Sequence, residues 1–141
     1  MKATSEKILL VDDEPNVLQA YERLLHDRFE METAVGPAEA LTAIRTNGPY
    51  AVVLSDMKMP QMDGITFLRM LRNNHHWNHV PVVVFTGAAD DAEMVEQAKE
   101  LGVSDLVCKG ANPAEALLGS VERILPHPKA SRRESHQLVA M

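Results

Sequence analysis

AVVLSDMKMPQMDG, residues 51–64, is the stretch of sequence that decides the fold. It begins with an apolar run, residues 51–54, which is too short for a helix and rich in strand-forming valine. An acidic residue, Asp56, follows that run, and Asp63-Gly64 then opens a helical pattern. The stretch therefore predicts a buried strand, an acidic loop and a helix, in that order.

The same strand and helix unit recurs five times along the chain. Further buried strands are predicted at residues 8–11, 82–85 and 106–108, and an edge strand with partial alternation at residues 30–35. Other helices are predicted to open at Pro15, Gly36-Pro37, Asp90-Asp91 and Asn112-Pro113. Strict alternation predicts an α/β fold, since parallel strands need crossover connections. We expect a doubly wound, five-stranded parallel sheet of order 2-1-3-4-5 with helices on both faces.

Length and periodicity indicate one domain. The chain has 141 residues, of which 45% are hydrophobic and 24% charged, an ordinary globular balance. The helical pattern ends near Leu125, so we expect one domain over residues 5–125. Residues 126–141 are expected to be a mobile tail or a cut linker, and a docking peptide is the weaker alternative. No separate output domain fits within this length.

Charge and cysteine content narrow the class of protein. The net charge of −6 argues against non-specific binding to nucleic acid or to an anionic membrane. No apolar stretch approaches the roughly 20 residues that a membrane helix needs, and the first apolar run is too short for a signal peptide. Cys108 is the single cysteine, which we expect to be an inert core thiol. We expect a cytoplasmic protein that binds neither nucleic acid nor membrane directly.

Polar side chains gather where the predicted strands end. They are Asp12 and Asp13 after the first strand, Asp56 after the third, Thr86 after the fourth and Lys109 after the fifth. Ligands of open α/β sheets bind at this edge. A single aspartate there could simply cap the following helix. Three converging carboxylates, however, would repel one another without a cation, and their hard oxygen ligands suit Mg²⁺.

The same set of residues predicts phosphoryl transfer. Mg²⁺ sites of this kind work alongside phosphate oxygens, and Lys109 adds a compact positive charge. A carboxylate can act as the nucleophile and form an aspartyl-phosphate. Asp56, at the tip of the central strand, is the best placed to do so. The metal and Lys109 would offset the charge on the transferred oxygens.

Several segments together resemble the receiver domain of bacterial response regulators, the CheY-like superfamily of two-component systems. They are ILLVDDEP at 8–15, SDMKMPQMDG at 55–64, FTG at 85–87 and CK at 108–109. The resemblance covers roughly residues 5 to 125, and the matching spacing of separate segments makes it specific.

The resemblance implies a role for each site residue. Asp13 and Asp56 would bind Mg²⁺ directly, the main-chain carbonyl of Lys58 would complete the protein ligands, and Asp12 would hold a metal-bound water. Asp56 would accept the phosphoryl group from a sensor histidine kinase or a phosphotransfer protein. Thr86 and Lys109 would then contact the phosphoryl oxygens and bias a two-state switch.

The resemblance also implies a signalling module instead of an enzyme with its own substrate. A downstream protein or output domain, still unknown, would bind the face made by the fourth helix, fifth strand and fifth helix, and a homodimer is left open. Two residues depart from the family. Leu106 stands where an aromatic residue is usual, which predicts weaker coupling, and Gly110 replaces a proline that is often cis, which predicts a trans bond.

Three other functions remain in competition. The first is a phosphorylation-independent scaffold or dimerisation receiver, against which the retained acidic residues, Thr86 and Lys109 weigh. The second is a phosphatase or phosphotransferase that acts on small molecules through an aspartyl-phosphate, but such enzymes usually carry an acid at the position of Lys58. The third is a flavodoxin-like cofactor carrier, which needs a phosphate cradle where this chain has Asp-Asp-Glu-Pro.

Overall fold

Five strands and five helices alternate in a computed structural model of the chain, which describes residues 7–57, 59, 62–74, 77–87, 92–108 and 113–125. The strands are β1 (Lys7–Asp12), β2 (Glu30–Val35), β3 (Val52–Asp56), β4 (Val82–Thr86) and β5 (Asp105–Cys108). The helices are α1 (Pro15–Leu25), α2 (Pro37–Asn47), α3 (Gly64–Arg72), α4 (Ala92–Glu100) and α5 (Pro113–Ile124). The predicted α/β alternation is therefore confirmed. The predicted fourth opening, Asp90-Asp91, and the predicted tail, 126–141, lie outside the described residues.

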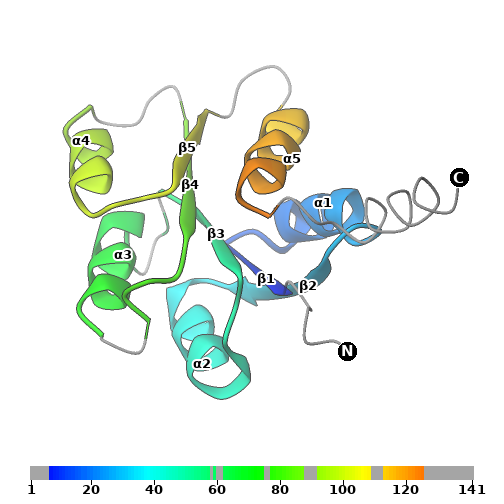
Figure 1. The fold of residues 1–141 in the computed structure, drawn as a ribbon, viewed down its shortest axis with the longest axis horizontal. Helices are drawn as coiled ribbons and strands as arrows, with labels where there is room; N and C mark the ends of the chain where they lie inside the picture. Colours follow the sequence, from blue (N-terminus) through cyan, green and yellow to red (C-terminus); the bar gives the residue numbers. More distant parts are fainter. Residues whose placement is uncertain are drawn as a thin grey trace, which may run out of the picture.

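All strand pairs of the sheet are parallel, in the order β2-β1-β3-β4-β5. This is the predicted order. Helices α1 and α5 cover one face of the sheet and α2, α3 and α4 cover the other (Figure 1). Because every strand runs the same way, the carboxyl ends of all five lie along one edge of the sheet. We call that the carboxyl edge and the opposite one the amino edge.

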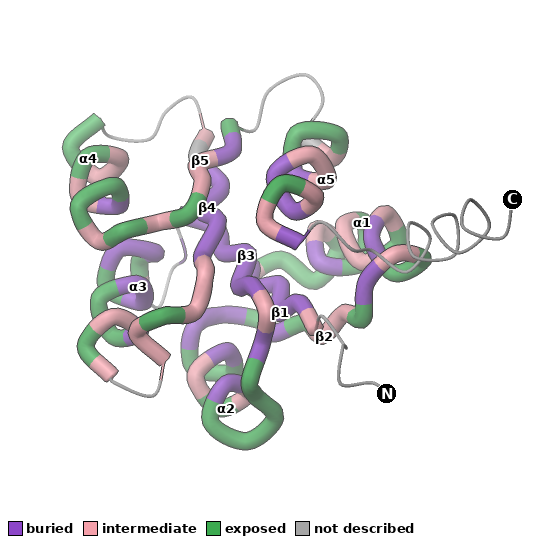
Figure 2. Tube along the Cα trace, viewed as in Figure 1, coloured by how far each residue is buried: buried purple, intermediate pink, exposed green. Residues whose placement is uncertain are grey.

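The hydrophobic core has two halves, one on each face of the sheet. Successive residues of β1 point to opposite faces, so Leu9 and Val11 pack under α2, α3 and α4, while Ile8 and Leu10 pack under α1 and α5. All four are fully buried. The central strands are buried along their length (Figure 2). Burial on both faces explains why these strands are continuous apolar runs.

The two edge strands differ in how well the sequence predicted them. In β2 only Ala34 is buried, as expected of an edge strand. The prediction of a fully buried fifth strand is wrong, because only Val107 of β5 is buried and Cys108 is exposed. The reason is the strand order, since β5 has a neighbour on one side alone. Cys108 is accordingly not the core thiol that was predicted.

One further expectation concerns membranes. Within the described ranges, no helix combines the length and the apolar character that crossing a bilayer requires.

Candidate functional site

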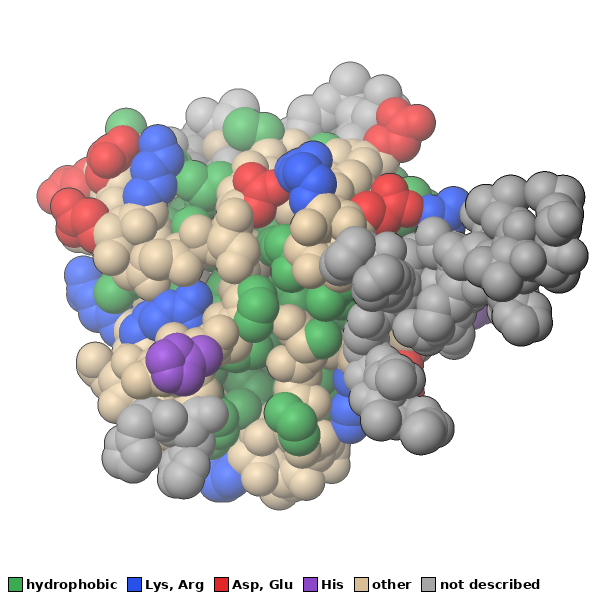
Figure 3. All heavy atoms as spheres, viewed as in Figure 1, with side chains coloured by type: hydrophobic (Ala, Val, Ile, Leu, Met, Phe, Trp, Pro, Cys, Tyr) green, Lys and Arg blue, Asp and Glu red, His purple; other side chains and the backbone are tan. Residues whose placement is uncertain are grey.

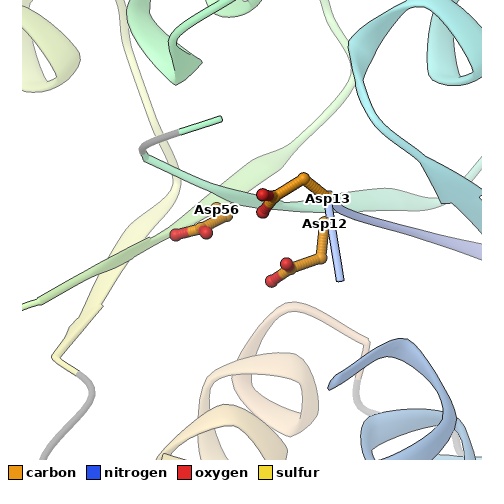
Figure 4. A group of neighbouring side chains, drawn as sticks. All are labelled: Asp12, Asp13 and Asp56. Carbon is orange, nitrogen blue, oxygen red and sulfur yellow. The ribbon is translucent and has the colours of Figure 1, made fainter. Parts of the chain in front are cut away.

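Three carboxylates meet at the carboxyl edge of the sheet. Asp12 ends β1, Asp13 follows it, and Asp56 ends β3. The register pairs Val11 with Ser55, so the residues that follow on the two strands leave the sheet side by side. One carboxylate oxygen from each of the three lies within 4.8 Å of the others. Figure 4 shows the side chains projecting from the strand ends into one space. The predicted convergence is therefore present.

Burial makes this convergence costly. Asp12 is 2% exposed and Asp56 8% exposed, while Asp13 is half-buried. Carboxylates whose oxygens lie within 4.8 Å of one another repel more strongly in a buried site than in water, because the local dielectric constant is lower. A bound cation would turn that repulsion into attraction, and carboxylate oxygens are the ligands that Mg²⁺ prefers. By donor chemistry and spacing, the three residues fit a Mg²⁺ ion.

Helix capping does not account for the three carboxylates. The N-cap of α1 is Glu14, which makes no side-chain capping hydrogen bond. Asp12 Oδ1 accepts the Glu14 N–H at 3.0 Å, which fixes the turn between β1 and α1. The N-cap of α3 is Asp63, whose carboxylate accepts the Thr66 N–H at 2.8 Å. Asp13 and Asp56 are thus not the capping residues of the helices that follow them.

Gly64 allows α3 to begin directly against the end of β3. A Cβ atom at this position would lie 2.7 Å from the main-chain oxygen of Asp56 and 2.9 Å from that of Met57. The Gly64 N–H donates to the Met57 carbonyl at 2.6 Å. Only glycine fits such an approach without displacing the backbone. The sequence indicated Gly64 only as a helix start, and its second role, holding the Asp56 loop, was missed.

The neighbouring strands bring the other predicted residues towards this edge. Thr86 ends β4 and pairs in register with Cys108, the last residue of β5. The backbone of Thr86 therefore lies at the same edge, two strands from Asp12. Lys58, Lys109 and Gly110 lie outside the described residues. The roles predicted for Thr86, Lys58 and Lys109 remain predictions.

The strands beside the site carry packed side chains behind it. Leu106 is half-buried and packs against the core under α3 and α4. Phe85, beside Thr86, meets Tyr21 of α1 edge-on, with ring centroids 5.5 Å apart and planes at 67°. Sequence reasoning missed this aromatic pair. No local signal could have found it, because the two residues lie in different units of the fold.

Comparison with known proteins gives consistent results. The family described as the response regulator receiver domain matches residues 8–121. A probable chemotaxis protein CheY of Rhizobium etli is 34% identical over 104 residues, which is 73% of this chain and 80% of that protein. The transcriptional regulatory protein PrrA of Mycobacterium tuberculosis is 34% identical over 139 residues, 98% of this chain but only 58% of that protein. The chain thus spans little more than half the length of PrrA.

Solved structures are similar over most of the chain. The chemotaxis response regulator CheY4 of Vibrio cholerae superposes with a TM-score of 0.75 at 30% identity. The superposition covers 86% of this chain and 99% of that one.

Proposed function

Because this chain belongs to the response regulator receiver domain family, we propose that Asp56 is its phosphoacceptor and that phosphorylation switches its binding to a partner. Receiver domains are signalling modules of two-component systems, and they interact with histidine kinases and output domains. We place the domain over residues 5–125, slightly wider than the matched 8–121. Leu125 supports the wider bound, since it is 7% exposed in the core under α1 and α5. Residues 126–141 would then be a tail or a linker.

The observation that carries the proposal is the position of the Asp56 carboxylate. It ends the central strand of the sheet, and one oxygen lies within 4.8 Å of carboxylate oxygens of Asp12 and Asp13. Asp13 and Asp56 would hold Mg²⁺ directly, the Lys58 main-chain carbonyl would join them, and Asp12 would hold the ion through a water. When bound, Mg²⁺ supplies positive charge that offsets both the carboxylates and the phosphoryl oxygens.

The reaction itself is a simple exchange of bonds. An oxygen of the Asp56 carboxylate attacks the phosphorus of a phosphohistidine on a sensor histidine kinase or a phosphotransfer protein. A phosphorus–oxygen bond forms while the phosphorus–nitrogen bond breaks, and the bonding pair returns to the histidine nitrogen. The product is an aspartyl-phosphate on Asp56. The Thr86 hydroxyl and the Lys109 ammonium would bind the phosphoryl oxygens, which would draw their loops towards the site.

Partner binding would then report the phosphorylated state. We place the partner on the face of α4, β5 and α5, where it would be a downstream protein, an output domain or a second copy of the chain. Leu106 lies on β5, and its half-buried side chain could repack when Thr86 moves. An aliphatic residue presents less surface than an aromatic one, so we expect a weaker coupling between the site and this face.

Phosphorylation of the purified chain tests the proposal. The protein is incubated with Mg²⁺ and acetyl phosphate, and its intact mass is measured with and without the metal chelated. Wild type should gain the mass of one phosphoryl group only when Mg²⁺ is present. Asp56→Ala should gain none, whereas Asp27→Asn, which changes an exposed aspartate, should behave as wild type.

Either of two outcomes would overturn the proposal. A folded wild-type chain that gains no mass, under conditions that phosphorylate another receiver domain, would leave a phosphorylation-independent scaffold or dimerisation receiver as the better account. Transfer that survives Asp56→Ala would mean that another residue is the acceptor.

A further inference from the structure

A pocket of about 390 Å³ opens at the amino edge of the sheet, away from the three carboxylates. Its wall comes from the end of α2, from the loop that leads to β3 and from the loop that leads to β4. The residues that form it include Ile44, Arg45, Pro49, Tyr50, Trp77 and Val80. Figure 3 views the amino edge and shows hydrophobic side chains in the hollowed middle of that face. Its volume lies within the range of small-molecule sites, roughly 300–1,000 Å³.

One side of the pocket is held by a polar network. The Tyr50 hydroxyl donates a hydrogen bond to the Glu32 carboxylate, and Tyr50 is 7% exposed. Lys7 Nζ lies 3.5 Å from Glu32 Oε2, donates to the Asn47 carbonyl at 2.8 Å and lies 5.2 Å from the centroid of the Tyr50 ring. These contacts fix the ring of Tyr50 before any ligand arrives. A preformed wall lowers the entropy lost on binding.

The other side is held through the main chain. The Trp77 N–H donates to the Asn74 carbonyl at 2.9 Å, and the Val80 N–H donates to the Trp77 carbonyl at 3.1 Å. The Val80 carbonyl in turn accepts from Arg72 Nη1 at 2.9 Å. The Trp77 side chain is half-buried and packs against the core under α2, α3 and α4. Both sides of the pocket are therefore shaped by contacts that do not depend on an occupant.

The chemistry of the wall selects a ligand class. Two aromatic residues, Tyr50 and Trp77, stand with the aliphatic side chains of Ile44 and Val80, which favours a flat apolar group. Arg45 is exposed and supplies the charge, and none of the described residues that line the pocket is acidic. A guanidinium binds a carboxylate with two parallel hydrogen bonds. We infer that the pocket binds a small aromatic carboxylate, its ring between Tyr50 and Trp77 and its carboxylate on Arg45.

Trp77 makes this inference directly measurable, because it is the single tryptophan of the chain. Its fluorescence is followed as the full chain is titrated with 3-phenylpropionate, and separately with 3-phenylpropanamide, the uncharged counterpart. Arg45→Gln removes the proposed anchor, and Arg23→Gln, an exposed arginine of α1, is the matched control. Melting curves of the variants check that each is folded.

We expect a saturable fluorescence change with 3-phenylpropionate in wild type and in Arg23→Gln. The affinity should fall about tenfold for the amide and for Arg45→Gln, as loss of a charge-assisted contact predicts. Amide shifts in a ¹H–¹⁵N spectrum should move first at Ile44, Tyr50 and Val80. Equal affinity for acid and amide, or shifts centred on the carboxyl edge, would overturn the inference. A dimer would also overturn the inference, if sedimentation detects one that covers the pocket and if the ligand leaves that dimer unchanged.

Discussion

The carboxyl and amino edges of the same sheet differ in charge: carboxylates gather at the first, and an arginine is hydrogen-bonded to main-chain carbonyls at the second. At the carboxyl edge, Asp12, Asp13 and Asp56 bring three like charges within 4.8 Å of one another. At the amino edge, Arg72 donates to three main-chain carbonyls, those of Val80, Leu101 and Gly102, at 2.9, 2.9 and 3.1 Å. The carboxyl edge therefore holds like charges whose repulsion a bound cation would offset. At the amino edge, hydrogen bonds from one arginine connect the loops that precede β4 and β5.

The largest change in stability should come from removing the hydrogen bonds that Arg72 makes at the amino edge. Burial lowers the pKa of its guanidinium. The Arg72 side chain also links α3 to the residue after α4 and to the loop before β4, through hydrogen bonds to the Leu101 and Val80 carbonyls. Arg72→Ala should lower the free energy of unfolding by about 3 kcal/mol, since hydrogen bonds to charged groups contribute about 1.5–3 kcal/mol each and water replaces part of that. Urea denaturation gives the value. Arg69 is an exposed arginine of the same helix, and Arg69→Ala should change the free energy of unfolding by no more than about 0.5 kcal/mol. If both variants lost the same stability, the hydrogen bonds of Arg72 would not be the cause.

A smaller change in stability, of opposite sign, is expected when the repulsion among the three carboxylates of the carboxyl edge is reduced. Asp13→Asn removes one of three like charges, so without divalent metal the variant should be more stable than wild type by about 1 kcal/mol. Adding Mg²⁺ should raise the melting temperature of wild type but not that of the variant, because binding stabilises only a chain that holds the ion. Thermal melts with EDTA and with Mg²⁺ measure both. Asp27→Asn serves as the control, and a variant that keeps the full wild-type response to Mg²⁺ would remove Asp13 from the site.

The smallest effect concerns a single carboxylate at the amino edge. Burial by itself would raise the pKa of Asp105, but hydrogen bonds from Ser120, Arg123 and the Leu106 N–H outweigh burial and lower it. A lowered pKa means that the ionised form stabilises the fold above the unfolded value of 3.8 and that this contribution is lost as pH falls through the folded pKa.

Asp105→Asn should therefore cost about 0.5 kcal/mol near neutral pH and nothing at a pH acidic enough to protonate the carboxylate of wild type. Urea midpoints of wild type and variant at the two pH values provide the comparison. A difference that is the same at both would show that packing around β5 and α5, and not charge, sets the contribution of Asp105.

Much of the carboxyl edge could be predicted from the sequence, because its information is local. The apolar runs of β1, β3 and β4 and the acidic residues that follow them are read directly from neighbouring positions. Parallel strands, with β1 paired to β3, then bring Asp12, Asp13 and Asp56 together. The fifth strand was predicted less well. Its apolar run matched a buried strand, but the strand order places it at the edge and leaves Cys108 exposed.

The sequence by itself determined the alternation of strands and helices and the placement of acidic residues directly after the strands, since side-chain periodicities of 2 and 3.6 residues are local properties. Only the tertiary structure decided the amino edge. Arg72 contacts carbonyls 8, 29 and 30 residues away, and Tyr50 bonds a glutamate 18 residues away. Every residue carries a main-chain carbonyl, so no pattern of side chains marks the ones that folding will place beside an arginine.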